Sequence, residues 1–512
     1  MYADSSPTPA TLPAYEVRKL VARGFAEMYG RELPEYNRFT VPVRASNLEQ
    51  LDRRPDPRVN RETLMEEKHG AIRVPGAEEM RVVTRIFAVM GMVPVEFYDM
   101  TILGEKSLPM IATAFRSTDR SVEESAFRMF CSMLHADSIP PQVREEVLAE
   151  LEKNRRLYPK FSPELLAALN RAERNGGLGA DDARRFATLV VEALSMHKDK
   201  VVNFALYSRL RQISDPLADI VLESPVLNHL TPRALDITDA VAQLNAAGIP
   251  MQTAIQGPPL REDGTPVQLN QIARIAAGED VFVTLDPAVL AAFESDPASL
   301  ERRRADAPRL ELQRGEQVAA YMARVEAALA THPIVIIQHK ARFGEIEARG
   351  VALTREGEAA YNAYGIEGEA DPAAKKQRAA RFEQEYPRTD RQLHDAGWAY
   401  YTYEATDAGR ARREGGAARP ADLLALLDAG DVVLAPQTYH DFLPFSAAAI
   451  FRANLTDGSQ GIGGNGQDAS DNRRRLEEAM GTTVADRHAL HRRDREESLQ
   501  RACAELNVRL SA

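Results

Sequence analysis

Two segments of the chain repeat the same order of apolar and polar positions. In the first, a strand-like run at residues 69–74 precedes a helical run at 77–90 and a second strand-like run at 93–98. In the second, an extended run at 228–237 precedes a helical run at 239–247 and further apolar residues. Alternation with a period of two indicates strands, and recurrence at three and four positions indicates helices. The pattern therefore predicts an α+β protein whose core is a pair of βαβββ units.

Around this core, the pattern predicts large helical additions. A chain of 512 residues exceeds the usual size of one hydrophobic core, so several cooperating units are expected. Ser162 before Pro163 indicates a break in the helical stretch, and Asn175 before two glycines indicates a helix end. The expected units are a helical segment (1–60), the first βαβββ half (61–120), a helical insertion (121–220), the second half (221–365) with a helical surface insertion near 288–330, and a mostly helical region that closes the site (366–512).

A histidine stands near the start of each predicted unit, at His69 and at His229. A third candidate ligand, Glu345, lies in a later strand-like run. Glu347 and His339 have the same parity in that run, so spacing alone does not choose among the three. Two histidines and one carboxylate leave open positions on an iron(II) ion, which suits reactions with dioxygen. The paired layout favours metal binding over the more common role of a lone histidine, which is to pack in a core or a turn.

Arg73 has the same strand parity as His69. The rise of a strand places the two residues about 13 Å apart along it, and the long arginine side chain can reach back toward a metal held by His69. Because a guanidinium binds a carboxylate with two hydrogen bonds, Arg73 is a candidate to hold the far end of a substrate that chelates the metal. The alternative is a surface strand with an incidental histidine and arginine.

A more closed metal site is a second possibility. In the first half, Glu96 and Asp99 stand where a fourth ligand would be expected in a non-redox enzyme of this core. If either residue binds the metal, isomerase or lyase chemistry is favoured over reaction with dioxygen. A third reading, from another class, is a metal-free binding protein that keeps the fold for ligand capture.

Composition narrows the class of protein. The formal net charge of −11 argues against a nucleic-acid partner, and the two cysteines exclude a disulfide framework and a thiolate zinc site. No apolar run approaches the roughly 18 residues that span a bilayer. The N-terminal residues lack the pattern of a secretory signal, so we expect a cytoplasmic enzyme that acts on a small molecule; the oligomeric state is left open. The chain contains neither a Gly-x-Ser-x-Gly elbow nor a dinucleotide fingerprint.

Six blocks of the sequence resemble the 2-oxoadipate dioxygenase/decarboxylase family, also called 2-hydroxyglutarate synthase. They follow one another in the family's order over most of the chain. The blocks are Lys68–Arg73, Phe87–Met92, Asn228–Ile237, Gly257–Pro259, Ala341–Thr354 and Asp441–Phe451.

The resemblance implies a vicinal-oxygen-chelate-like core and a non-haem iron(II) centre. Carried over position by position, it implies His69, His229 and Glu345 as metal ligands. It also implies Arg73 and Ser446 as substrate-binding residues, with Arg73 on the substrate's distal carboxylate. The implied reaction is the oxidative decarboxylation of 2-oxoadipate by dioxygen to D-2-hydroxyglutarate and carbon dioxide, a step of lysine catabolism.

One stretch departs from the family's pattern. Before Glu345 we expect a Gln-Thr-Ser-Phe-Lys-like block, and this chain instead has Val267–Arg274, Val281–Leu285 and the predicted insertion. Because this stretch precedes the ligand strand, it is expected to lie near the metal. The sequence therefore predicts the dioxygenase chemistry more directly than the substrate, and another 2-oxo acid remains an alternative to 2-oxoadipate.

Overall fold

The fold is described from a computed structural model. It covers residues 11–32, 34–55, 59–64, 68–101, 108–118, 127–195, 204–222, 225–252, 255, 257–258, 269, 271–274, 281–282, 309–310, 318–331, 336–337, 339–340, 344–366, 371–412, 419–439 and 466–510. No helix within these ranges is long and apolar enough to cross a membrane.

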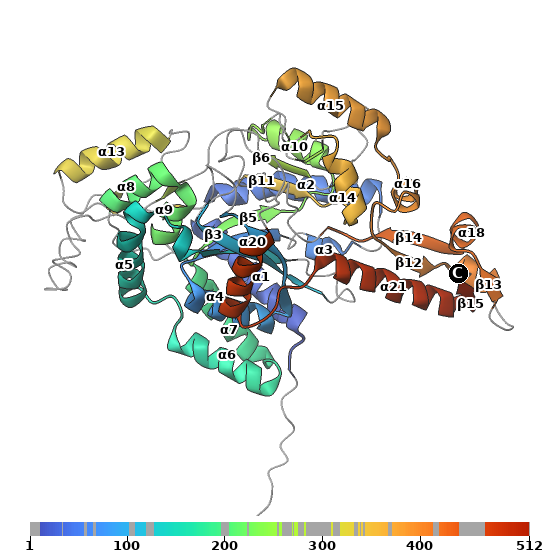
Figure 1. The fold of residues 1–512 in the computed structure, drawn as a ribbon, viewed down its shortest axis with the longest axis horizontal. Helices are drawn as coiled ribbons and strands as arrows, with labels where there is room; N and C mark the ends of the chain where they lie inside the picture. The colour runs from blue at the N-terminus through green and yellow to red at the C-terminus, as the bar shows by residue number, and fades with distance from the viewer. Residues whose placement is uncertain are drawn as a thin grey trace, which may run out of the picture.

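A five-stranded mixed sheet lies at the centre of the molecule (Figure 1). Its strands follow the order β2-β3-β4-β1-β5, so β1 is an inner strand with a neighbour on each side. β1 pairs in parallel with β4 and antiparallel with β5. The strands are β1 (Lys68–Val74), β2 (Met92–Asp99), β3 (Met110–Ser117), β4 (Arg128–Leu134) and β5 (Leu227–Pro232).

The first predicted unit is present and extends further than the sequence pattern indicated. The helix α4 (Ala77–Val89) connects β1 to β2, as predicted, and β3 and β4 follow in the same sheet. The prediction of a helical insertion over 121–220 is wrong at β4, which is a strand between β1 and β3. All seven residues of β4 are buried, so its side chains do not alternate between apolar and polar.

Helices cover this sheet and share its main hydrophobic core. α1, α4, α6, α7 and α20 contribute to that core, and Figure 1 shows α4, α6 and α7 on one side of the sheet. Ser162, where the sequence predicted a break, caps α6 by accepting a hydrogen bond from Leu165 N, and the helix ends before Gly176 at φ 66°, as predicted. The helices up to β5 are α1 (Ala14–Glu32), α2 (Pro34–Arg53), α3 (Arg61–Leu64), η3 (Ala136–Ser138), α5 (Pro141–Leu157), α6 (Pro163–Asn175), α7 (Ala180–Leu194), α8 (Phe204–Ile213) and α9 (Asp215–Leu222).

The second unit is attached to the open edge of β5. After β5 comes the helix α10 (Ile237–Ala246), and later β6 (Gln271–Arg274) pairs antiparallel with β11 (Glu345–Ala348). β11 lies beside the end of β5, because Ala234 N donates a hydrogen bond to Glu347 O. In the predicted insertion, α13 (Val318–Thr331) is helical, but Arg309–Leu310 is a short strand, β8, rather than helix. The other short strands are β7 (Val281–Phe282), β9 (Ile336–Ile337) and β10 (His339–Lys340).

The described part of residues 366–512 is mostly helical, with two pairs of short strands. Tyrosines and Phe382 form a separate aromatic core there, and α21 packs along β12 (Figure 1). The elements from β11 onward are α14 (Arg355–Asn362), α15 (Pro372–Glu385), α16 (Asp390–Asp395), β12 (Tyr401–Ala405), α17 (Asp407–Arg412), β13 (Arg419–Ala421), α18 (Leu423–Asp428), β14 (Val432–Pro436), α20 (Gly466–Met480), α21 (Arg487–Glu505) and β15 (Val508–Leu510).

Candidate metal centre

Adjacent strands place His69 and His229 on one face of the central sheet. In the antiparallel register of β1 and β5, His69 lies opposite Thr231 and His229 lies opposite Ala71. Because residues two apart on a strand share a face, both imidazoles point to the same side. Their ring centroids are 5.3 Å apart, and the ring planes are inclined by 21°. Both side chains are buried.

The strand β11 adds Glu345 to this pair of histidines. One donor atom from each of His69, His229 and Glu345 lies within 4.8 Å of the other two, and all three residues are buried. Nε2 of His229 is 2.9 Å from Oε2 of Glu345. That oxygen has no hydrogen bond to any described residue, so the two atoms face each other without the geometry of a hydrogen bond. An imidazole nitrogen and a carboxylate oxygen that converge in this way are typical of ligands around a metal position.

Glu347, the other glutamate of β11, has a different task. The Nδ1 atom of His69 donates a hydrogen bond to Oε2 of Glu347 at 2.8 Å. A histidine whose Nδ1 is held by a carboxylate presents Nε2 to a metal, and such outer partners orient the ring and raise its basicity. Arg128 of β4 pairs with the remaining oxygen of Glu347. The structure therefore assigns different contacts to two glutamates that strand parity could not distinguish: Glu345 faces the metal position, and Glu347 orients His69.

The protonation states of His69 and Glu345 suit a divalent metal. Burial lowers the pKa of His69 to about 4, although Glu347 opposes this effect, so the imidazole is neutral near pH 7. Burial by itself would raise the pKa of Glu345, but the neighbouring His229 and Arg274 lower it below its ordinary value. Two imidazoles and one carboxylate are a donor set that iron(II) and zinc both accept. The residues present thus fit the metal that the sequence implies.

Arg73, the predicted anchor for a substrate carboxylate, is buried on β1 at the same strand parity as His69. Its Nη1 atom is 3.1 Å from Oδ2 of Asp219 on α9. The guanidinium is thus already oriented by an ion pair. Ser446, the second predicted substrate-binding residue, lies outside the described residues, and so does the side chain of His339.

Glu96 and Asp99, the alternative ligands, contact other groups. Glu96 has a positive φ of 63° at an irregular position of β2, and its carboxylate is 3.4 Å from Arg487. Asp99 accepts hydrogen bonds from Thr101 and from Asn472 on α20. Neither residue belongs to the group of side chains that can hold a metal within the described part of the chain.

Three contributors to the site were missed by the sequence analysis. Arg128 pairs with Glu347, Arg274 of β6 pairs with Glu345, and the hydroxyl of Thr231 is 2.5 Å from Nε2 of His229. The parity of Thr231 with His229 was a usable signal. The two arginines carried none, because a charged residue on a strand is ordinarily solvated.

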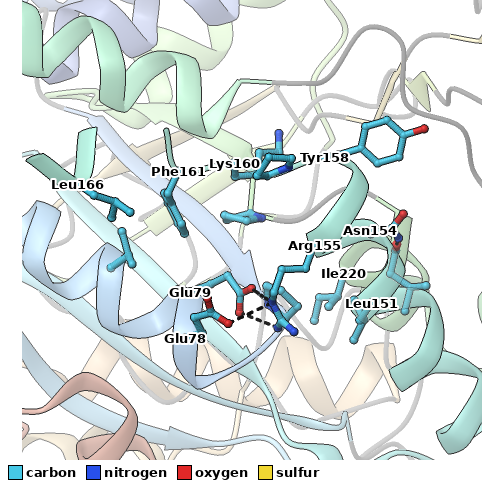
Figure 2. Close-up of a pocket in the computed structure, with 15 residues that line it drawn as sticks. Glu78, Glu79, Leu151, Asn154, Arg155, Tyr158, Lys160, Phe161, Leu166 and Ile220 are labelled. Carbon is cyan, nitrogen blue, oxygen red and sulfur yellow. Dashed lines mark hydrogen bonds and ion pairs between the residues drawn. The ribbon is translucent and has the colours of Figure 1, made fainter. Parts of the chain in front are cut away.

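A separate cavity of about 150 Å³ lies between α4, α5, α6 and α9 (Figure 2). Arg155 reaches Glu79 and Glu78 across one wall, with the shortest contact at 2.6 Å from Nε to Glu79 Oε1. None of the three candidate ligands lines this cavity. It is therefore distinct from the metal centre.

An α+β fold with two imidazoles and a carboxylate gathered on neighbouring strands defines a candidate metalloenzyme of the His-His-carboxylate class. A family model described as 2-oxoadipate dioxygenase/decarboxylase matches residues 21–287 and 318–454. The chain belongs to this family, as its sequence motifs predicted. The interval between the two matched parts, residues 288–317, falls within the predicted insertion.

Similar proteins agree with this assignment over almost the whole chain. A 2-oxoadipate dioxygenase/decarboxylase from Pseudomonas putida is 34% identical over 96% of this chain and 97% of its own length. One from Escherichia coli is 30% identical over 96% of this chain and 98% of its own length. The crystal structure of hydroxyglutarate synthase from Pseudomonas putida in complex with 2-oxoadipate superposes with a TM-score of 0.75 at 30% identity, covering 98% of this chain and all of the other.

Proposed function

We propose that this protein is an iron(II)-dependent dioxygenase that oxidatively decarboxylates a 2-oxo dicarboxylic acid, with 2-oxoadipate as the preferred substrate and D-2-hydroxyglutarate and carbon dioxide as products. The observation that carries the proposal is the buried group of His69, His229 and Glu345 in a chain of this family. We place this group in a paired βαβββ core of the vicinal-oxygen-chelate type and the reaction in lysine catabolism.

The three ligands would hold iron(II) and leave positions open for the substrate and dioxygen. Iron, when bound, supplies the redox chemistry that activates dioxygen. The reaction balances without a second organic substrate. The bond between the first carboxylate and the keto carbon breaks and carbon dioxide leaves. One oxygen atom then completes a new carboxylate on the former keto carbon, and the other becomes a hydroxyl on the next carbon.

The remaining task of the protein is to bind and orient the acid. Arg73 would pair with the distal carboxylate, and its ion pair with Asp219 holds the guanidinium in place for this contact. Ser446 is proposed as a further substrate-binding residue. Glu347 keeps the His69 imidazole turned toward the metal through the Nδ1 hydrogen bond.

Oxygen uptake tests the proposed reaction. Protein reconstituted anaerobically with iron(II) is mixed with 2-oxoadipate and with a panel of other 2-oxo acids, while oxygen consumption and carbon dioxide release are recorded. Uptake on 2-oxoadipate, with equal amounts of oxygen consumed and carbon dioxide released, is the expected result. Oxygen uptake only with another 2-oxo acid would support the dioxygenase reaction but show that 2-oxoadipate is not the substrate. Absence of uptake in a protein that retains iron would contradict the dioxygenase assignment.

Arg73→Ala tests the binding mode. Loss of a charge-assisted contact of about 1.5–3 kcal/mol should raise KM for dicarboxylic 2-oxo acids by roughly 10- to 100-fold. Turnover of a 2-oxo acid with one carboxylate should change little, because that substrate never used the contact. Equal losses of activity on both kinds of substrate would show that Arg73 does not bind the distal carboxylate.

A further inference from the structure

The two oxygens of the Glu345 carboxylate have different surroundings. Oε1 is 2.6 Å from Nη2 of Arg274. Oε2 faces Nε2 of His229 at 2.9 Å and makes no hydrogen bond to a described residue. One oxygen is therefore engaged by a cation, and the other is directed into the metal position.

The backbone explains how Arg274 reaches this carboxylate. Arg274 is the last residue of β6, and in the antiparallel register with β11 it lies directly opposite Glu345. Side chains directly opposite each other on paired strands lie close together on one face. The backbone carbonyl of Arg274 also accepts a hydrogen bond from Gln252 N at 2.7 Å. The backbone of Arg274 is thus fixed by its pairing with β11 and by the hydrogen bond from Gln252, which places its side chain beside Glu345.

We propose that Arg274 is a positioning residue of the metal centre, which holds Oε1 of Glu345 so that this glutamate binds the metal through Oε2 alone. A carboxylate that used both oxygens would occupy one more coordination position. A chelating 2-oxo acid and dioxygen need the open positions of such a site. Arg274 therefore keeps the coordination sphere open for substrate.

This inference rests on the proposed metal centre and deepens it. Arg274 ends the stretch Val267–Arg274, which departs from the pattern expected for the family. In this chain the altered stretch acts on the metal through Glu345, and not only on the shape of the substrate pocket. Changes of sequence there alter how the ligand carboxylate binds.

Cobalt(II), whose visible spectrum reports coordination number and geometry, is the probe for the test. The full-length protein is stripped of metal and titrated anaerobically with cobalt(II), with a chelator as competitor. The variants are Arg274→Gln and Arg274→Met, which remove the charge, and Arg274→Lys, which keeps it. Arg155→Gln is the matched control, because it also breaks an arginine–glutamate pair, at the separate cavity of Figure 2.

The neutral variants should bind cobalt(II) roughly 10- to 100-fold more weakly, the usual effect of removing an outer partner of a metal ligand. Their spectra should shift toward a higher coordination number. Arg274→Lys should recover part of the affinity and the original spectrum, and Arg155→Gln should match the unaltered protein. If one neutral variant does not fold, as judged by circular dichroism, the other decides.

Three results overturn the proposal. The first is an unchanged affinity and spectrum in a folded neutral variant. The second is a weaker affinity with an unchanged spectrum, and the third is an equal loss of affinity in Arg155→Gln. Either of the last two would indicate an effect on the fold rather than on the carboxylate. Oxygen uptake by the unaltered protein is measured separately. If the variants change cobalt(II) binding as expected but the unaltered protein consumes no oxygen, the role of Arg274 stands and the proposed function is wrong. If the unaltered protein consumes oxygen but the variants bind cobalt(II) normally, the proposed function stands and the role of Arg274 is wrong.

Discussion

Glu345 and Glu347 are two residues apart on one strand, yet they differ in what they contact. Glu345 faces His229 and Arg274, whereas Glu347 accepts the Nδ1 hydrogen bond of His69 and pairs with Arg128. Burial alone would raise the pKa of the Glu347 carboxyl, but Arg128 and His69 hold it well below its usual range. Glu347 thus stays charged next to His69, which favours the imidazole tautomer that a metal needs.

Glu347→Gln is predicted to weaken metal binding without abolishing it. The amide keeps a hydrogen-bond acceptor for His69 but loses the negative charge, so iron(II) affinity should fall by about tenfold, at the lower end of effects of outer partners. Anaerobic titration with a competing chelator measures this. Glu404→Gln, on an exposed position of β12, is the control and should behave like the unaltered protein. An unchanged affinity in Glu347→Gln would exclude this role.

The sequence could not identify which residue of the later strand is the third ligand. Strand parity places Glu345, Glu347 and His339 on one face but does not distinguish them, because the choice depends on where β11 lies along β5. That position is a tertiary property. Likewise, Arg128 pairs with a glutamate 219 residues away, and no local pattern encodes such a contact.

At the scale of elements, the strand β4 shows where pattern reading fails. Both of its faces are covered, so its residues are a continuous buried run that periodicity cannot distinguish from a helix. By contrast, β1, α4 and β2 were correctly predicted, and α6 began and ended at its capping signals. The helices α4 and α6 could be predicted because buried residues recur along them at three and four positions.

The contact between α14 and the chain before β12 requires a glycine. A Cβ built at Gly357 would lie 1.9 Å from the carbonyl oxygen of Trp398, and a backbone atom cannot move aside as a side chain does. Gly357→Ala should therefore destabilise the protein by about 1–3 kcal/mol, the usual cost of overpacking. Urea unfolding measures the change. Gly179→Ala, where a Cβ meets nothing within 4 Å, is the matched control, and equal stability of both variants would refute the argument.

His488, in the first turn of α21, should make the free energy of unfolding depend on pH. Burial, together with Arg487 and Arg355, lowers the pKa of His488 to about 3 in the folded protein. The unfolded chain keeps a histidine pKa of about 6.5 and binds the proton first, so this group stabilises the fold fully above pH 6.5 and progressively less toward pH 3. His488→Asn should flatten the loss of unfolding free energy between pH 7 and pH 4.5. An unchanged slope in urea titrations would contradict this prediction.

At the scale of the whole molecule, the candidate ligands connect parts of the fold that are far apart in sequence. His69 belongs to β1, whereas His229 and Glu345 come from β5 and β11. The order of the family's motifs predicted that these three residues come together, and the structure gathers their donor atoms within 4.8 Å of one another.

Metal should therefore stabilise the molecule as a whole. A metal present at 100 times its dissociation constant adds about 2.7 kcal/mol if it binds only the folded state. Thermal unfolding of the chelator-treated protein should occur at a lower temperature than that of the iron(II)-loaded protein, measured without oxygen. Glu345→Gln should lose this difference. A difference that persists in Glu345→Gln would place the stabilising metal elsewhere.

The hydrogen bond between His69 and Glu347 spans 278 residues of chain. At a synthesis rate of about 5–20 residues per second, the ribosome needs roughly 15–60 seconds after making His69 before Glu347 exists. During that time β1 lacks both glutamates of β11, and the nascent chain offers at most the two imidazoles to a passing metal ion. A metal ion can consequently meet all three candidate ligands only after residue 345 has been made and β11 has paired beside the end of β5.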